Sequence, residues 1–293
     1  MIYLPSELPI NPDGSVYHLG IKPEHLAPTI ILVGDPGRVE RVAAHFDTIE
    51  ARAHHREFVS ATGTIGSMRL MVLSTGIGTD NIDIVVNELD ALANIDFETR
   101  TNKAEHTSLQ LVRLGTSGSI QKEIQPGSLV MSEWALGFDN LIHYYAGSSS
   151  LRNLPFEEAF MNHMQWNPDL SRPYAIAASQ KLVEQFRKIS IAGITISSPG
   201  FYGPQGRELR IKPYYDQFTE RIASFRFEDR SITNFEMEGS AIYGLSRFLG
   251  HEAITVCSII ANRITKEFDS EADKTIGKMI ELSLDVLLDL NKA

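Results

Sequence analysis

The fold of this chain is constrained most by an apolar run that leads into a stretch of glycine and hydroxyl residues. Residues 109–112 read L-Q-L-V, a mainly apolar run, and residues 113–119 read R-L-G-T-S-G-S. In open α/β sheets, ligands bind beyond the carboxyl ends of the strands, where glycines leave backbone N–H groups free to face an anion. The pattern predicts a buried strand followed by an anion-binding turn, with the guanidinium of Arg113 facing a phosphate or carboxylate. A simple turn with an exposed arginine is the alternative.

Two other segments predict a strand, a glycine turn and a helix. Residues 29–33 are a β-branched run that stops at G-D-P-G-R (34–38), and apolar residues then recur at helical spacing. Arg38 lies in the first turn of this helix, where an acidic residue would suit the helix dipole better, so it indicates a bound anion. Residues 74–81 resemble a dinucleotide-binding fingerprint, but Asn81 replaces its third glycine, so we expect a turn and no dinucleotide.

A loop rich in glycine, proline and aromatic residues follows a predicted strand at residues 191–197. In this loop, residues 198–207, Phe201 can stack on a flat ring, while Gln205 and Arg207 offer an amide and a forked donor. Loops of this composition often present binding surfaces. The alternative is a connection whose aromatic side chains pack on the core.

Two carboxylates mark the start of a later helix. Glu236 and Glu238 lie in N-F-E-M-E-G (234–239), before apolar residues at helical spacing. Carboxylates here can stabilise a helix N-terminus, and they can also accept hydrogen bonds from two adjacent sugar hydroxyls. Both interpretations remain open from these residues alone. A buried strand at 253–261 and an amphipathic helix at 270–290 complete the chain.

Three segments carry no clear periodicity. Residues 1–28 contain five of the 13 prolines, so we expect an extended arm over the surface. Residues 95–108 predict a polar surface excursion. Residues 135–173 predict an irregular segment that serves as a lid, a partner surface or an insertion. No linker divides the chain, and we expect a single domain over residues 1–293.

Composition limits the class of protein. The net charge of −10 argues against a general nucleic-acid binder, which needs a basic face to release counterions. The single cysteine, Cys257, lies in an apolar run, so neither a disulfide nor a catalytic thiol is expected. The N-terminus lacks a signal-peptide pattern and no apolar run approaches ~18 residues, so we expect a cytoplasmic protein without membrane contact.

These motifs occur in the order found in the nucleoside phosphorylase family, which the sequence resembles, most closely the members that cleave uridine. The resemblance spans roughly 250 residues. It rests on V-Y-H-L-G from Val16, G-D-P-G-R-V from Gly34, H-R-E-F from His55, S-T-G-I-G from Ser74, R-L-G-T-S-G from Arg113, F-Y-G-P-Q-G-R from Phe201, F-E-M-E from Phe235 and A-N-R from Ala261.

The resemblance implies a fold, a reaction and an assembly. The fold would be a three-layer α/β/α arrangement with a central mixed sheet. The reaction would be the reversible phosphorolysis of uridine to uracil and ribose 1-phosphate, with inorganic phosphate as co-substrate and with neither cofactor nor metal. The protein would form a homo-oligomer, a dimer or a hexamer, with active sites shared between subunits.

The resemblance also implies a role for each motif. The phosphate site would consist of the Gly34 backbone, Arg38, Arg113 and Thr116, with Arg56 of the partner subunit. The ribose site would consist of Glu236, Met237, Glu238 and Thr116, with His18 of the partner subunit. The base site would consist of Phe201, Gln205, Arg207 and, more distantly, Arg263. The residues nearest to the chemical step would be Arg113, Thr116 and Glu238.

The chemistry of phosphorolysis agrees with this set of residues. The reaction passes through an oxocarbenium-like ribosyl centre, so an enzyme must hold phosphate below C1′ and stabilise the departing base. Arginines and a helix N-terminus can hold the phosphate. Gln205 and Arg207 can hydrogen-bond a uracil edge as negative charge builds on it.

Three other functions remain open from the sequence alone. A purine nucleoside phosphorylase needs an acid for the leaving purine, and relatives place an aspartate where this chain has Asn262. Nucleosidases that use water lack the anion-binding arginines. A non-catalytic nucleoside-binding protein would keep the fold and lose the site. Departures from the family pattern include the reversed order of Gly203 and Pro204, Phe235 in place of a tyrosine, and the longer excursion at 95–108. Residues 79–81 also depart from it, because they replace a glycine-rich stretch that some members use near a monovalent cation.

Overall fold

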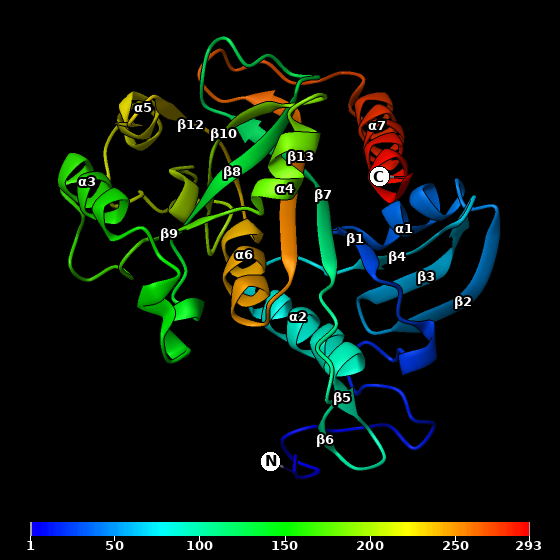
Figure 1. Ribbon diagram of the computed structural model, residues 1–293. Helices are drawn as coiled ribbons and strands as arrows, with labels where there is room; N and C mark the ends of the chain where they lie inside the picture. The colour runs from blue at the N-terminus through cyan, green and yellow to red at the C-terminus, as the bar shows by residue number, and fades with distance from the viewer. Residues whose placement is uncertain (1, 293) are drawn as a thin grey trace.

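A computed structural model describes residues 2–292 and shows an 11-stranded mixed sheet with helices on both faces (Figure 1). The strands of this sheet are β1 (Thr29–Val33), β2 (Thr48–His55), β3 (Phe58–Ile65), β4 (Met68–Ser74), β7 (Gln110–Ser119), β8 (Leu129–Gly137), β9 (Tyr174–Ala177), β10 (Ile191–Ser197), β11 (Arg226–Phe227), β12 (Arg230–Glu236) and β13 (Glu252–Asn262). A separate hairpin consists of β5 (Ile95–Asp96) and β6 (Thr101–Asn102). The α-helices are α1 (Pro36–Ala43), α2 (Thr79–Asn94), α3 (Leu154–Met164), α4 (Gln180–Phe186), α5 (Phe218–Ser224), α6 (Gly239–Phe248) and α7 (Ala272–Lys292).

The strand order brings the ends of distant segments together. Along the sheet the order is β11-β12-β10-β8-β13-β7-β1-β4-β3-β2, and β12 also pairs with β7, which closes part of the sheet on itself. β1 runs parallel to β4 and to β7, and β13 runs parallel to β7. The carboxyl ends of these strands therefore meet on one edge, which is where sheets of this type bind ligands.

The side chains of β1 show why helices cover both faces of the sheet. Successive side chains of a strand point to opposite faces, and all of β1 is buried. Ile30 and Leu32 pack with apolar residues of α2 and α6, whereas Ile31 and Val33 pack with those of α1, α4 and α7. The expected three-layer α/β/α fold with a mixed sheet is confirmed. A continuous apolar run such as β1 is typical of a strand buried on both faces.

Residues 113–119 lie inside β7 and do not form a turn beyond a strand. β7 pairs with β13 over its whole length, and with β12 at Gly118 and Ser119. The prediction of a glycine turn was therefore wrong. A glycine in a strand interior also occurs where another backbone or a side chain approaches closely, as the guanidinium of Arg113 approaches Gly115 here.

The segment at 135–173 contains regular structure, so the prediction of an irregular segment was wrong. β8 continues to Gly137, and α3 begins after Asn153, whose side chain accepts a hydrogen bond from the N–H of Phe156. Phe156 and Phe160 of α3 are buried against the strands β10 and β12. Tertiary packing of such aromatic side chains, more than local periodicity, stabilises a short helix.

The N-terminal segment is extended but partly buried. The N–H of Tyr3 donates to the carbonyl of Arg100 in the excursion that holds β5 and β6. Val16, Leu19 and Ile21 are buried in the same apolar cluster as α2. An arm that lies only on the surface was therefore the wrong expectation for this part of the segment.

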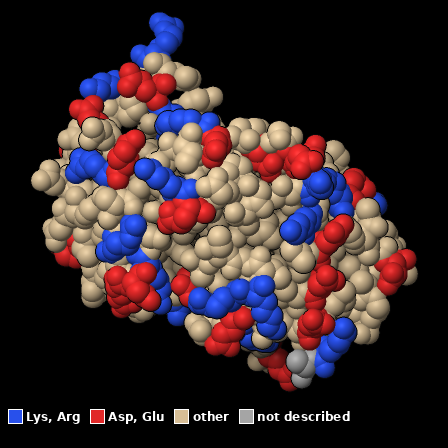
Figure 2. Space-filling view, turned by 90° about the horizontal axis from the view of Figure 1, so that it is seen from above, with Lys and Arg blue, Asp and Glu red and all other residues tan. Residues whose placement is uncertain are grey.

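The surface carries both signs of charge. In the face shown in Figure 2, basic and acidic side chains are interspersed. This distribution agrees with the argument from net charge against a general nucleic-acid binder. Among residues 2–292, no helix is both long enough and apolar enough to cross a membrane.

Candidate active site

A cavity of about 930 Å³ lies at the carboxyl ends of β1, β4, β7 and β12. This volume suits a small-molecule site. The cavity brings together most of the residues expected in the site: Gly34, Arg38, Arg113, Thr116, Phe201, Gln205, Arg207, Glu236, Met237 and Glu238. Three expected residues are not among those that line it: His18, Arg56 and Arg263.

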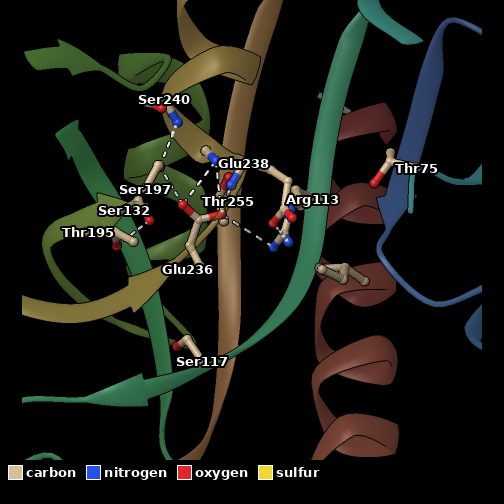
Figure 3. Close-up of polar contacts among 12 residues, drawn as sticks. Thr75, Arg113, Ser117, Ser132, Thr195, Ser197, Glu236, Glu238, Ser240 and Thr255 are labelled. Carbon is tan, nitrogen blue, oxygen red and sulfur yellow. Dashed lines mark hydrogen bonds and ion pairs between the residues drawn. The ribbon is translucent and has the colours of Figure 1, made fainter. Parts of the chain in front are cut away.

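Arg113 and two carboxylates form a buried ionic cluster in the lining of this cavity (Figure 3). Arg113 reaches across from β7, and its Nη2 donates to Oε2 of Glu238. Its Nη1 lies 3.7 Å from Oε2 of Glu236. Within the described part of the chain, Nη1 and Nε of Arg113 have no hydrogen-bond partner. Because buried donors are almost always paired, a ligand in this cavity would complete the hydrogen bonding of the guanidinium.

Burial and charge act in opposite directions on this cluster. Burial alone would lower the pKa of Arg113, but Glu238 and Glu236 raise it above its ordinary value. Burial raises the pKa of Glu236, and the charge of Arg113 opposes this shift. Burial, followed by the charge of Arg113, lowers the pKa of Arg38. Two guanidiniums that repel each other in a sheltered cavity favour the binding of an anion.

The two carboxylates have different roles in the fold. Glu236 accepts hydrogen bonds from the N–H groups of Glu238 and Gly239, and the hydroxyl of Ser197 also donates to it. Glu236 therefore stabilises the N-terminus of α6. Glu238 accepts a hydrogen bond of 2.8 Å from the N–H of Gly78, at the start of α2. The helix-terminus interpretation thus fits Glu236. Glu238 lines the cavity, directly precedes α6 and hydrogen-bonds the residue that precedes α2.

Gly115 makes room for the side chain of Arg113. A Cβ atom at position 115 would lie 1.9 Å from Nη1 of Arg113 and 3.1 Å from Sγ of Cys257. We expect Gly115→Ala to displace the guanidinium and to lower kcat/KM at least about tenfold, since misplacing a reacting or binding group by roughly 1 Å is costly. Steady-state kinetics of phosphorolysis, the reaction that the sequence resemblance implies, measure this effect. Gly277→Ala, whose Cβ meets an ordinary contact at 3.6 Å, is the control, and equal activities of the two variants would contradict the prediction.

The turn after β1 holds Arg38 against β7. Asp35 precedes α1 and accepts a hydrogen bond of 2.9 Å from the N–H of Gly37, so an acidic residue does cap this helix. Arg38 is buried, and its Nη1 donates to the carbonyl of Leu114 at 3.0 Å. The tertiary structure therefore directs Arg38 toward the strand that carries Arg113.

The loop after β10 contributes Phe201, Gln205 and Arg207 to the cavity lining. Arg207 lies over the ring of Phe201, with its Cζ 3.7 Å from the ring centroid, and its Nη1 donates to Oε1 of Gln205. Arg263 lies over Phe235 and donates to the carbonyl of Gln205 at 2.6 Å. Burial and the charge of Arg207 lower the pKa of Arg263 to about 10. Two cations and two aromatic rings around one amide favour a flat ligand with acceptor groups.

His18 and Arg56 lie near each other, outside the cavity lining. The ring Nδ1 of His55 hydrogen-bonds the carbonyl of His18 at 2.8 Å, and Arg56 lies over Tyr17, with its Cζ 5.9 Å from the ring centroid. Arg56 has a left-handed φ of 56°, which is unfavourable for a residue with a side chain. His18 and Arg56, which were expected to come from a partner subunit, therefore lie close together in space, away from the cavity of their own chain.

Further lining residues were not predicted to belong to the site. They are Asp35, Pro36, Glu57, Gly76, Ile77, Asn81, Gly115, Ser117, Gly118, Phe235, Ile260, Ala261 and Phe268. Most of them lie in or beside a predicted motif. Three of them, Gly76, Ile77 and Asn81, belong to the glycine turn predicted at 74–81, which could have indicated that they line the site. Phe268 follows no motif. An isolated β-bridge to Ala261 brings it to the cavity, and local sequence does not indicate such a contact.

Comparison with known proteins agrees with this geometry. A family model described as the phosphorylase superfamily matches residues 28–290, and the chain belongs to this superfamily. Uridine phosphorylase of Thermococcus kodakarensis is 27% identical over 97% of this chain and 91% of its own. Uridine phosphorylase of Klebsiella aerogenes is 30% identical over 86% of this chain and 88% of its own. A Trypanosoma brucei nucleoside phosphorylase that shows uridine phosphorylase activity matches with a TM-score of 0.87 and 29% identity, over 96% of this chain and 99% of that one.

Proposed function

We propose that the protein catalyses the reversible phosphorolysis of uridine to uracil and ribose 1-phosphate, as a pentosyltransferase of pyrimidine nucleoside salvage. One observation carries the proposal: a single cavity holds two buried arginines, a carboxylate pair and a loop suited to a flat, acceptor-rich ring. Membership of the phosphorylase superfamily and the uridine phosphorylase relatives support the same reaction.

Inorganic phosphate is the co-substrate and binds at the Gly34 backbone, Arg38, Arg113 and Thr116. The unpartnered Nε and Nη1 of Arg113 donate to it, and its negative charge relieves the repulsion between the two guanidiniums. Phosphate is thereby fixed against C1′ of the nucleoside. Holding both substrates in one frame contributes on the order of several kcal/mol to the lowering of the barrier. The proposed reaction uses neither a cofactor nor a metal.

The ribose and the base are bound by the remaining lining residues of the cavity. Glu238 and Met237 hold the ribose, with Glu236 behind them, because a carboxylate can accept hydrogen bonds from adjacent hydroxyls. Phe201 stacks on uracil while Gln205 and Arg207 hydrogen-bond its edge. As the glycosidic bond breaks, negative charge builds on the base and the guanidinium of Arg207 stabilises it more than it stabilises the ground state.

The active site is shared between subunits in this proposal. His18 and Arg56 lie close to each other but outside the cavity of their own chain, so a second copy is needed to bring them to the substrates. The assembly is therefore a homo-oligomer of at least two subunits. Because strands from both halves of the chain share one sheet, each subunit forms a single domain. The one cysteine, which is buried and free, suits the cytoplasm.

Sharing of the site predicts complementation between two inactive variants. Arg56→Ala lacks the donated arginine, and Arg38→Met lacks an arginine of the receiving cavity. In a hybrid dimer one cavity combines the intact Arg38 with the intact Arg56 of the partner subunit, so a mixture in equal parts should regain about a quarter of the unmutated activity. Subunit exchange is followed with fluorescent labels. Complete exchange without regained activity would exclude a shared site.

The proposed reaction itself is tested by the phosphate-dependent release of free base from a panel of nucleosides. We expect release of uracil from uridine that requires phosphate, together with ribose 1-phosphate as the second product. Release in the absence of phosphate would identify a nucleosidase. Preference for inosine or adenosine would identify a purine nucleoside phosphorylase, and the lack of any release would leave a nucleoside-binding protein.

A further inference from the structure

The carboxylate of Glu88, on α2, holds the N-terminal segment at His18. Its oxygens accept hydrogen bonds from the backbone N–H of His18 at 3.1 Å and from that of Leu19 at 2.9 Å. Oε1 also lies 2.6 Å from the ring Nδ1 of His18. The side chain of Glu88 is only 13% exposed, so this contact is sheltered from water. One carboxylate thus holds both the backbone and the ring of the same residue.

These contacts determine which ring nitrogen of His18 carries the proton. An ionised carboxylate only accepts hydrogen bonds, so Nδ1 must be the donor. In the neutral imidazole the other nitrogen, Nε2, then has a free lone pair and accepts a hydrogen bond. The His18 side chain is 29% exposed, and among residues 2–292 no hydrogen bond engages its Nε2, so this nitrogen has the capacity to bind a ligand.

Other contacts, which do not involve Glu88, also hold the N-terminal segment around His18. Val16 and Leu19 are fully buried in the apolar cluster that includes α2, and His55 hydrogen-bonds the carbonyl of His18. Anchoring of the backbone therefore does not require a charged partner for the imidazole ring. The contact between Glu88 and Nδ1 has a separate consequence, which is the orientation and the protonation of the ring.

We propose that Glu88 is a positioning residue that holds His18 in the Nδ1–H form, so that Nε2 accepts a hydrogen bond from the 5′-hydroxyl of a nucleoside bound to the partner subunit. This inference rests on the proposed function and adds to it a residue on α2 that touches neither substrate. It also assigns the direction of the hydrogen bond: the hydroxyl donates and the imidazole accepts.

The variant Glu88→Gln tests the inference with two substrates. Its amide can donate to Nδ1, which reverses the preferred tautomer and leaves Nε2 as a donor. KM for uridine should rise about tenfold with little change in kcat, as expected when a hydrogen bond of roughly 1.4 kcal/mol is lost. For 5′-deoxyuridine, which lacks the hydroxyl, KM should stay within about twofold of its unmutated value. Glu24→Gln, the same change at an exposed site of the same segment, should leave both substrates unaffected.

A second measurement reads the tautomer without any catalysis. Nitrogen-15 shifts of labelled histidines, assigned to His18 with His18→Ala, should show Nδ1–H in the unmutated protein and a shift toward Nε2–H in Glu88→Gln. An unchanged tautomer in this variant would overturn the positioning role. An equal loss of activity on uridine and 5′-deoxyuridine would also overturn it, because that pattern indicates a displaced segment.

The two measurements separate this inference from the proposed function. If the unmutated protein releases no uracil, the proposed function fails while the tautomer of His18 still tests the contact with Glu88. If His18→Ala affects uridine and 5′-deoxyuridine equally, the 5′-hydroxyl role of His18 is wrong and the inference falls with it, although phosphorolysis stands. If His18→Ala discriminates between them and Glu88→Gln does not, only the role of Glu88 is wrong.

Discussion

Uridine is expected to be cleaved with a kcat/KM about 10⁴-fold above that of inosine, because a site that hydrogen-bonds one base leaves buried polar groups unpaired with another. The edge of uracil presents a ring N–H and two carbonyls. The amide of Gln205 can donate and accept, and Arg207, which already contacts that amide, donates to the remaining carbonyl. Gln205 is almost fully buried, so an unmatched base leaves this amide without water as a substitute.

Asn262, at the position where purine-specific relatives carry an acid, has a structural role in this chain. Nδ2 of Asn262 donates to the carbonyls of Gln121 and Ile124, and its Oδ1 accepts the N–H groups of Ile264 and Thr265. Every hydrogen-bonding group of this side chain is thereby used, and Asn262 does not line the cavity. It therefore offers no proton to a leaving purine.

Initial rates with uridine and inosine at saturating phosphate measure the preference. Arg207→Ala should reduce it, by lowering kcat/KM for uridine about 10- to 100-fold while the slow cleavage of inosine changes little. Arg210→Ala, a change at an exposed arginine three positions further along the chain, is the matched control. Similar kcat/KM values for uridine and inosine in the unmutated protein would overturn the choice of base and leave phosphorolysis standing.

Arg113→Ala is expected to lower kcat/KM by about two orders of magnitude or more, since a preorganised charged donor in a sheltered site contributes several kcal/mol to transition-state stabilisation. The loss should be largest at limiting phosphate, because Nε and Nη1 are the donors left for that substrate. Kinetics over a range of phosphate concentrations measure it. Arg247→Ala, at an exposed position of α6, is the control. Activity near the unmutated value at limiting phosphate contradicts the role of Arg113.

The same variant should also lose stability. Removal of Arg113 leaves the buried carboxylates of Glu236 and Glu238 without their cation, and breaking such a pair costs about 3–5 kcal/mol. Activity is therefore compared per folded molecule, with the melting temperature measured beside it. Arg113→Lys keeps the charge but not the forked donor, so it should recover part of the stability while activity stays low. Full recovery of both by lysine would show that only charge matters at this position.

Local patterns predicted several elements of the fold correctly. β1 and β13 were predicted because strands buried on both faces require continuous apolar runs, which few other structures share. The helices after Gly34 and near the C-terminus were predicted because a helix that covers a sheet repeats its apolar residues at helical spacing. In each case the element buries the side chains that its own pattern identifies.

Other elements were missed because their determinants lie elsewhere in the chain. Residues 113–119 have the composition of a turn, yet they form a strand because β13 and β12 supply hydrogen-bond partners on both sides. Gly115 is small because the guanidinium of Arg113 passes close to it. Short aromatic segments such as α3 become helical through tertiary packing, which no local period records.

The sequence alone determined the chemistry that this protein can offer: an acidic chain with arginines placed after predicted strands and two carboxylates at a helix start. Only the tertiary structure decided which of these groups meet. Arg113 and Glu238 are 125 positions apart and touch because the order of strands places the end of β12 beside β7. His18 and Arg56 are kept out of the same cavity by the same fold. Contacts between distant segments depend on how strands pair, and residue spacing along one strand or helix carries no record of that pairing.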